Sequence, residues 1–518
     1  MKKRKRIIAL ILSFVLVFLC ACSKNNAGQD GEGYVSTNEN TINIGVYNFD
    51  TYNPIATVSQ SVSQTSALIY DSLVRRKTDK SIELRLCNNY SVSNDGLTYT
   101  FNLRNDISWH DGSEFVAEDV EYTFKMIETV AQSAYKGRLD NVKEYIRTGK
   151  NTFVVSLYSP DGSFISFMDM PIIKNGTDCV NSLKEYIPIG TGPYKYIDSD
   201  LSRAIHLVRN ENYIVGQKPL IEQIIIKQLP DKEALLSALE AREIEAVPFT
   251  ASQMRNYNPK GNLNTVAYTN NILTFIGINT TRPGLDKALV RRAMSYSINR
   301  DEIAQNVYFG RADGVNVPIA PDSFLSKQIY HYERDTQRAI KLLNEAGYTM
   351  SPDGVMLNSE GSPLSFNLYV SLGNELRASA AEKIKENLAQ IGVNIRILKL
   401  SFEDYQTQIS THEYDMFIGE VKIGKNHDIS SFIGSSAQYC VYPSERADSL
   451  LRRCKNATNA PAFEKSYNEL AEIFLSNAPI IPIVMGTDAL VLNSKIKGVT
   501  PPVEGNIFSN IETWYIEN

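Results

Sequence analysis

The chain has 518 residues, with 53 Lys and Arg against 58 Asp and Glu, so its formal net charge is −5. Removing residues 1–21 takes away five basic residues and no acidic ones, which leaves a net charge of about −10. That balance argues against nucleic-acid binding, which requires a concentrated basic surface. The roughly 500 remaining residues exceed one hydrophobic core, so we expect two or more lobes.

The N-terminus has the pattern of a secretory signal. MKKRKR precedes a mostly apolar run from Ile7 to Cys20, which is shorter than the roughly 20 residues of a spanning helix. No later stretch is long and apolar enough to span, so we expect the body of the chain to be exported and soluble. Residues 22–40 contain almost no large apolar side chains, which predicts a flexible tether.

The end of this signal, Leu19-Cys20-Ala21-Cys22, resembles a bacterial lipobox. The resemblance implies cleavage before Cys22 and a lipid on Cys22, which would anchor the protein to the membrane. The chain would then lie on the outer face of the cell membrane, or in the periplasm if an outer membrane exists. An ordinary signal with incidental cysteines, or a CxC metal site, is the alternative.

Ordered structure is expected from Thr41 onward. In TINIGVY the apolar residues Ile42, Ile44 and Val46 alternate, which predicts a strand with one buried face. A helical stretch is predicted over roughly 60–69. Alternation returns in LTYTFNLR (97–104), and NTFVVSLY (151–158) is a further predicted strand.

Farther along the chain the hydrophobic period changes to that of a helix. Apolar residues between Leu376 and Ile391 form one stripe, Gly392 is placed to end the helix, and VNIRI follows as a strand. A second helix is predicted between Asp335, placed as its cap, and Gly347. Such helix–glycine–strand units indicate α/β lobes.

Other motifs carry little chemistry. Four cysteines follow Cys22, too few for a disulfide scaffold, and their pairing cannot be deduced from spacing: Cys87, Cys179, Cys440 and Cys454. No GxSxG or HExxH occurs, so an exported hydrolase has no support. Polar residues around WHDG could be imagined as a metal cluster, but a turn and a helix dipole explain them: His110, Asp111, Glu114, Glu118 and Asp119. No metal or cofactor is predicted.

Five stretches carry a family resemblance. They are NDISWHDGSEFVAEDVEYTFKMI (105–127), PIGTGPYKY (188–196), FIGINTTRPGLDKALVRRAMSYSINRDEI (275–303), NEAGY (344–348) and NAPIIPIV (477–484). Together, in this order, they resemble the extracellular solute-binding proteins of family 5, the dipeptide- and oligopeptide-binding lipoproteins of ABC importers.

The resemblance implies an α/β fold of the periplasmic-binding-protein-like type II class, in its large three-domain, two-lobe form with a hinge. Domain I would combine three segments, 41–75, 186–275 and 488–518. Domain II would be 76–185, and domain III 276–487. Ligand would fill the cleft between the lobes and favour the closed state.

The resemblance also implies candidate site residues. Gly190, Thr191 and Gly192 would form a rigid chain that crosses between the lobes near the ligand. Asn279 and Thr280 would lie at the crossover into domain III, where family members present polar groups to ligand. A structural asparagine in a turn is the alternative for Asn279.

The largest departure from the family lies in residues 413–432. Peptide-binding members place a Trp and then an Asp here, and the Asp carboxylate binds the peptide's α-amino group. In this chain that position falls near Lys425, which cannot pair with an ammonium group. An N-blocked peptide, a carboxylate-bearing solute or a different anchor remain open. Glu420, Lys422, Lys425 and Tyr439 are the candidate ligand contacts.

The sequence therefore predicts the substrate-binding lipoprotein of an ABC importer, not an enzyme. It would capture peptides or a related small solute and deliver them to a membrane permease. The expected partners are the ligand, ABC permease and ATPase subunits, and membrane lipid, with no nucleic acid, and the protein is expected to be a monomer. The alternative is a binder of nickel, haem or sugar on the same fold, or a sensor of external peptides.

Overall fold

The computed structural model describes residues 40–177, 186–199, 204–254, 257, 259 and 261–517. The predicted signal, Cys22, Cys179 and the predicted tether up to residue 39 lie outside these residues.

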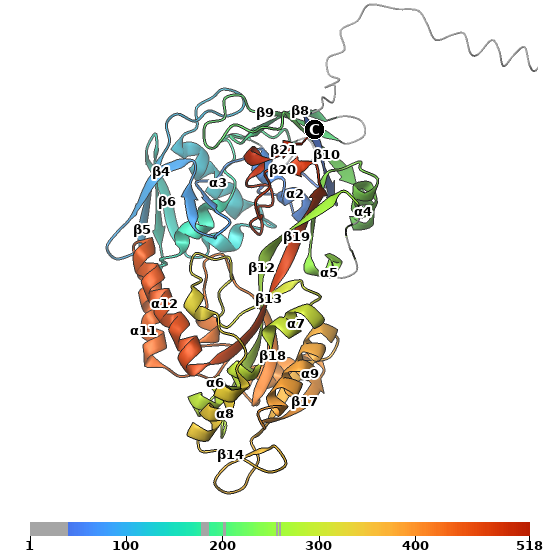
Figure 1. The fold of residues 1–518 in the computed structure, drawn as a ribbon. Helices are drawn as coiled ribbons and strands as arrows, with labels where there is room; N and C mark the ends of the chain where they lie inside the picture. The colour runs from blue at the N-terminus through green and yellow to red at the C-terminus, as the bar shows by residue number, and fades with distance from the viewer. Residues whose placement is uncertain are drawn as a thin grey trace, which may run out of the picture. The chain divides into compact units, whose positions relative to one another are not determined.

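An 11-stranded mixed sheet is the largest element of the described chain (Figure 1). Its strands, from one edge to the other, are β17 (Asn394–Leu400), β16 (Ser365–Ser371), β18 (Met416–Lys422), β12 (Leu263–Ile278), β19 (Ile480–Asn493), β11 (Ala246–Phe249), β1 (Thr41–Tyr47), β10 (Gln223–Leu229), β9 (Ile205–Arg209) and β8 (Tyr194–Ser199), and β13 (Ala312–Gly314) pairs with β19.

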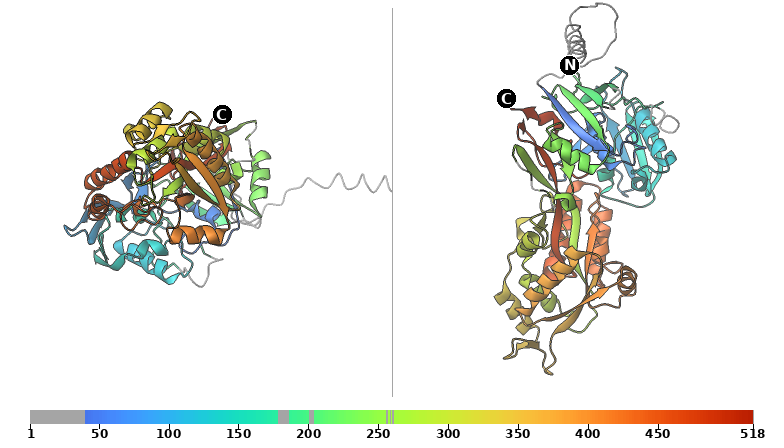
Figure 2. Two further views of the ribbon diagram at one scale, coloured as in Figure 1. Left: turned by 90° about the horizontal axis from the view of Figure 1, so that it is seen from below. Right: turned by 90° about the vertical axis from the view of Figure 1, so that its right-hand side faces the viewer.

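Two long strands, β12 and β19, form an antiparallel ribbon through the middle of this sheet (Figure 2). Their pairing runs from Leu263 opposite Asn493 to Gly277 opposite Ile480. The predicted borders between domains I and III, at 275/276 and 487/488, fall inside these two strands. The chain therefore passes these borders as paired β-structure rather than as loops.

The predicted first strand is confirmed as β1, which runs parallel to β10 and β11 with its alternate isoleucines fully buried. The helix predicted over 60–69 is instead two short pieces, α2 (Gln60–Ser63) and a 3-10 turn (Ser66–Leu68). Thr65 explains the break, because its hydroxyl and its amide both bind the Val62 carbonyl and so close the first turn.

A second sheet of four strands lies within residues 87–157. It consists of β4 (Cys87–Val92), β5 (Thr98–Leu103), β7 (Thr152–Leu157) and β6 (Val142–Gly149) in that order. The predicted alternation in β5 is confirmed, with Tyr99, Phe101 and Leu103 buried. Helix α3 (Ala117–Thr129) covers the sheet, and its Phe124 ring packs 5.0 Å from the Phe153 ring.

The remaining helices mostly flank the large sheet. They are α4 (Lys232–Glu240), α5 (Ala251–Met254), α6 (Ala288–Ser297), α7 (Arg300–Asn306), α8 (Thr336–Glu345), α9 (Glu375–Ala389), α10 (Phe402–Ser410), α11 (Glu445–Lys455) and α12 (Ala460–Asn477). The caps predicted for α8 and α9 are confirmed. Asp335 accepts a hydrogen bond from the Arg338 amide, and Gly347 and Gly392 have φ of +89° and +76°, which glycine adopts without steric cost.

Short hairpins and 3-10 turns complete the described chain. They are β2 (Val74–Arg76), β3 (Ile82–Leu84), β14 (Thr349–Met350), β15 (Met356–Leu357), β20 (Ile496–Lys497), β21 (Tyr515–Ile516), and turns at Lys136–Leu139, Phe164–Asp169, Gln328–Tyr330, Ser430–Phe432 and Ile511–Thr513.

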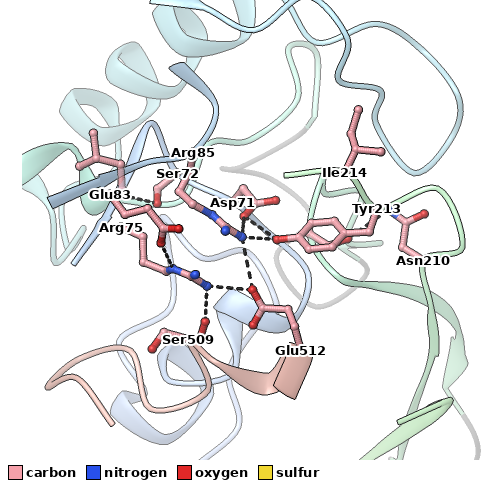
Figure 3. Close-up of polar contacts among 12 residues, drawn as sticks. Asp71, Ser72, Arg75, Glu83, Arg85, Asn210, Tyr213, Ile214, Ser509 and Glu512 are labelled. Carbon is pink, nitrogen blue, oxygen red and sulfur yellow. Dashed lines mark hydrogen bonds and ion pairs between the residues drawn. The ribbon is translucent and has the colours of Figure 1, made fainter. Parts of the chain in front are cut away.

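A buried ionic cluster joins three sequence-distant segments (Figure 3). The Arg85 guanidinium lies 3.2 Å from Asp71 Oδ1 and 3.5 Å from Glu512 Oε1, and it also binds the Tyr213 hydroxyl. Arg75 pairs with the same Glu512 oxygen at 2.8 Å. Because Asp71, Arg85 and Glu512 are all at most 7% exposed, this cluster fixes the C-terminal segment against residues 71–85.

Three thiols in the described chain, those of Cys87, Cys440 and Cys454, are free and buried. The closest pair in sequence, Cys440 and Cys454, is therefore not joined. Within the described residues, none of the helices has the length and apolar character needed to cross a membrane.

Candidate functional site

A cavity of about 690 Å³ lies beside the β12–β19 ribbon. Its walls come from segments that are far apart in sequence: α2, the turn around Tyr135, residues 250–252, β12, the loop after α7, β18, β19 and residues 504–505. The volume lies in the range of about 300–1,000 Å³ that is typical of small-molecule sites.

The cavity wall combines aromatic rings with uncharged polar groups. Tyr135, Tyr268, Tyr308 and Phe309 supply rings, and α2 contributes amide and hydroxyl side chains. Burial raises the pKa of Tyr308 to about 12, so its hydroxyl stays protonated, and this hydroxyl lies 3.0 Å from the Thr274 hydroxyl. Such a wall suits an amphipathic ligand that offers both apolar side chains and hydrogen-bonding groups.

The floor of the cavity is an irregular stretch of β12. The register between β12 and β19 shifts after Thr269, and Asn271 adopts φ of +58°, a conformation that asparagine tolerates better than most residues. Asn270 Oδ1 accepts a hydrogen bond from the Ile272 amide, and Asn270 Nδ2 donates to Asp488 Oδ1, both at 3.0 Å. A Cβ on Gly486 would stand 2.7 Å from Asn270 Oδ1, so this close approach requires glycine.

One carboxylate at the cavity edge is shared by three cations. Asp169 Oδ2 lies 2.6 Å from Lys425 Nζ and 3.3 Å from Arg76 Nε, and Asp169 Oδ1 lies 2.5 Å from an Arg138 nitrogen. Burial alone raises the pKa of the Asp169 carboxyl, but the three cations together hold it well below its ordinary value. Burial lowers the pKa of Lys425 to about 7; Asp169 opposes this shift, and Arg138 and Arg76 add to it.

Other charged groups of the wall are bound differently. Glu504 forms an ion pair with Lys422 through Oε1 and accepts a hydrogen bond of 2.8 Å from Asn271 Nδ2 through Oε2. Asp488 accepts a 2.9 Å hydrogen bond from the Ala251 amide, and burial raises the pKa of the Asp488 carboxyl. Lys422 and Glu504 thus neutralise each other.

The structure brings three of the predicted ligand contacts to the cavity. Glu420 and Lys422 lie on β18, Lys425 lies in the loop after it, and all three line the wall. Tyr439, in contrast, packs its ring 5.5 Å from Phe275 and does not line this cavity.

The other two predicted contacts are engaged within the protein. Asn279 Nδ2 donates to the His412 carbonyl at 3.0 Å, and Asn279 Oδ1 accepts from the Thr281 hydroxyl at 2.6 Å. The Thr280 hydroxyl donates to the Val441 carbonyl at 2.6 Å. These contacts fit the structural asparagine that the sequence left as an alternative, and neither residue lines the cavity.

The stretch Gly190-Thr191-Gly192 packs against the backbone of Ile69. The Gly192 amide donates to the Ile69 carbonyl at 2.8 Å, and a Cβ on Gly190 would stand 1.7 Å from that carbonyl oxygen. The His110 ring binds the Gly190 amide and the Gly192 carbonyl, and burial lowers the pKa of His110 to about 4. The two glycines are therefore required by close packing, and none of the three residues lines the cavity.

The polar residues around WHDG are explained by the start of α3. Asp119, rather than a capping hydroxyl, binds the Val116 amide at 2.9 Å, and it also accepts from the Trp109 indole at 3.1 Å. Across the described residues, no group of three or more His, Cys, Asp or Glu side chains is placed to hold a metal ion.

Sequence reasoning missed several residues of the cavity. Arg138 and Asp169 belong to 3-10 turns with no motif of their own, and Glu504 lies in the C-terminal segment. Asp169 and Lys425 are 256 positions apart, and nothing in the spacing of a single sequence reports such a pair.

Comparisons with known proteins agree with this architecture. Residues 81–438 match the family described as bacterial extracellular solute-binding proteins, family 5 middle. The oligopeptide-binding protein AppA of Bacillus subtilis is 22% identical over 549 residues, covering all of both chains. The haem-binding protein A of Haemophilus influenzae is 25% identical, over 94% of this chain and 95% of its own. The nickel-binding periplasmic protein of Escherichia coli is 26% identical over 69% of each chain.

Solved structures show the same fold. HbpA2 from Haemophilus parasuis superposes with a TM-score of 0.73 at 22% identity, covering 92% of this chain and all of that one. AppA from Bacillus subtilis in complex with a nonapeptide superposes with a TM-score of 0.52 at 20% identity, covering 92% and 99%. The predicted α/β fold of the periplasmic-binding-protein-like type II class is thereby confirmed.

Proposed function

Because this chain belongs to the bacterial extracellular solute-binding proteins of family 5, we propose that it captures a peptide or a related small solute in the 690 Å³ cavity and delivers it to an ABC permease. Members of this family are transport binding proteins rather than enzymes, and they work outside the cytoplasm with ABC permease and ATPase partners.

The observation that carries the proposal is the composition of the cavity wall. The wall takes residues from both strands of the β12–β19 ribbon and from the region of the four-stranded sheet, through Ala134, Tyr135 and Arg138. A ligand that touches all of these segments would favour the arrangement in which they meet. In this proposal domains I, II and III keep the boundaries predicted from sequence, and the ribbon is the hinge.

Peptides are the favoured ligand class, and Glu420, Lys422 and Lys425 are the proposed contacts. The mixture of rings, amides and hydroxyls suits peptide backbone and varied side chains, and the relative AppA is an oligopeptide-binding protein. Haem and nickel are named for other relatives and serve as comparison ligands in the test.

The binding test uses the chain without residues 1–21 and with Cys22→Ser. Di- to octapeptides with free and acetylated N-termini, haemin and nickel–histidine are screened by thermal shift, and the hits are measured by calorimetry. A ligand that binds only the folded chain raises its melting temperature. Ala134→Trp, which fills the cavity, is expected to abolish binding, whereas Gln132→Trp, an exposed neighbour outside the wall, should keep it. Equal binding by both variants would refute the cavity as the site.

The membrane anchor is a separate part of the proposal. We propose that Cys22 is lipidated after cleavage of residues 1–21 and holds the monomer at the membrane through the tether. Expressed in a bacterium, the wild-type chain should incorporate labelled palmitate and fractionate with membranes, and the Cys22→Ser chain should do neither. Palmitate incorporation into the Cys22→Ser chain would contradict the assignment.

A further inference from the structure

The cluster around Asp169 has more positive than negative charge. Three cations, Arg76, Arg138 and Lys425, lie within 3.3 Å of this one carboxylate. The side chains of Asp169 and Arg76 are 8% and 2% exposed, and those of Arg138 and Lys425 are 16% and 23% exposed. Charges removed from water are stable only when paired, so the cluster lacks anionic partners for two of its cations.

Neighbouring carboxylates do not supply those partners. Glu504 offers Arg76 only its backbone carbonyl, at 2.9 Å, because its carboxylate is bound by Lys422 and Asn271. Asp322, which binds the Thr269 hydroxyl, pairs with Lys80 at 2.8 Å, and the ion pairs of Arg76, Arg138 and Lys425 in the described chain do not include Glu420 or Asp488, which line the same cavity. Among the described residues, Asp169 is therefore the one carboxylate that pairs with these three cations.

Two of the three cations face the cavity. Arg138 and Lys425 both line its wall, whereas Arg76 lies behind them. One terminal nitrogen of Arg138 donates to Asp169 and to the Phe167 carbonyl, and a guanidinium has further N–H groups that can donate to a ligand. Its guanidinium lies 4.6 Å from the centre of the Tyr135 ring, which holds it in place.

We propose that Arg138 and Lys425 together bind an anionic group of the ligand, which in a peptide is a carboxylate, and that Asp169 is the positioning residue that holds both cations at the wall. This inference rests on the proposed function and narrows its ligand class to carboxylate-bearing solutes. It also gives Lys425 a role in binding ligand.

The electrostatics of Lys425 agree with this geometry. Burial and the two arginines favour the neutral amine and lower its pKa to about 7. A ligand carboxylate bound by Arg138 and Lys425 would stabilise the charged amine of Lys425 and raise its pKa, as a nearby opposite charge does. Ligand binding would thereby supply the counter-charge that the protein lacks.

The test compares tripeptides prepared in matched forms, as the C-terminal acid and as the C-terminal amide, by calorimetry at pH 6.5. The acid should bind the wild-type chain on the order of tenfold more tightly, as a charge-assisted contact does. Arg138→Gln and Lys425→Met should each remove most of this preference, while amide binding persists. Lys425→Arg, which keeps a positive charge at this position, should keep the preference for the acid.

Lys150→Met is the control, because it removes a lysine that pairs with Glu114 at 2.5 Å on an exposed surface and does not line the cavity. It should keep the acid preference. Equal binding of acid and amide by wild-type protein would overturn this inference while leaving the binding function intact; binding of neither form would overturn both. A preference that survives Arg138→Gln and Lys425→Met, or that Lys150→Met abolishes equally, would overturn the assignment of these residues.

Discussion

Two charged clusters of this protein each join sequence-distant segments, but one has more anions than cations and the other has more cations than anions. Around Arg85 and Arg75 stand three carboxylates, those of Asp71, Glu83 and Glu512 (Figure 3). Around Asp169 stand three cations. The first cluster lies away from the 690 Å³ cavity, and the second forms part of its wall.

The difference indicates what each cluster is for. In the Arg85 cluster both arginines have carboxylate partners, so its cations are compensated, and the cluster holds the C-terminal segment in place. In the Asp169 cluster the compensation is incomplete on the side that faces the cavity. Buried ion pairs are weak evidence for stability, and incomplete ones next to a cavity point to a ligand.

The largest expected effect is on the compensated cluster. Arg85→Met leaves Asp71 and Glu512 buried without their shared cation, so we expect the free energy of unfolding to fall by about 3–5 kcal/mol. Urea unfolding followed by circular dichroism measures this loss. The folded Arg85→Met protein should still bind the C-terminal acid of a peptide more tightly than its amide. A change in this preference would show that the two clusters are coupled.

A smaller loss is expected at the cavity. Asp169→Asn removes the carboxylate common to three cations. Because Arg138 and Lys425 are partly exposed at the wall, we expect the free energy of unfolding to fall by about 2–4 kcal/mol. The double variant Asp169→Asn, Lys425→Met should recover part of this loss, since it removes one repelling charge. If urea unfolding shows that the double variant is no more stable than Asp169→Asn alone, then Lys425 is not repelled by the arginines.

The pH dependence of ligand binding follows from Lys425. With a pKa of about 7, its amine is mostly charged at pH 6 and mostly neutral at pH 8.5, while the Asp169 carboxyl, whose pKa is lowered, stays ionised. The acid-over-amide preference should therefore fall a few-fold between these pH values. Calorimetry of the Lys425→Arg variant should show no such fall.

Stability should depend on pH with the opposite sign. The lysine loses its proton near pH 7 when folded but near pH 10.4 when unfolded. Between these values the unfolded chain binds more protons, so the contribution of Lys425 to the unfolding free energy rises with pH across this window. Urea unfolding without ligand should show this rise in the wild type and a flatter profile in Lys425→Met.

The smallest effect is expected at an exposed ion pair. Arg104 pairs with Asp106 at 2.8 Å, and Asp106 is 54% exposed. Arg104→Met should lower the free energy of unfolding by less than about 1 kcal/mol. A loss comparable with that of Arg85→Met would mean that burial does not separate the two kinds of pair.

Local patterns were enough to predict many elements. The alternating residues of β1 and β5, and the Asp335 and Gly347 ends of α8, could be found from sequence because each depends on neighbours a few positions away. The helix predicted over 60–69 was wrong because Thr65 makes a local side-chain bond that apolar spacing does not report.

The cavity could be predicted only in part. Glu420, Lys422 and Lys425 were found because they surround a departure from a family pattern. Asn279 was placed by the same resemblance, but its amide is bound within its own turn and to the His412 carbonyl. Arg138, Asp169 and Glu504 carry no motif, and their meeting with Lys425 and Lys422 depends on packing among distant segments.

By itself the sequence determined the class of the fold, the family, and the unusual lysine at position 425, because hydrophobic period, capping residues and motif order are local properties of the chain. Only the tertiary structure decided that Lys425 meets Asp169 and that two arginines share that carboxylate. Charge balance is a sum over neighbours in space, and chain segments 256 positions apart become neighbours only when the fold closes around the β12–β19 ribbon.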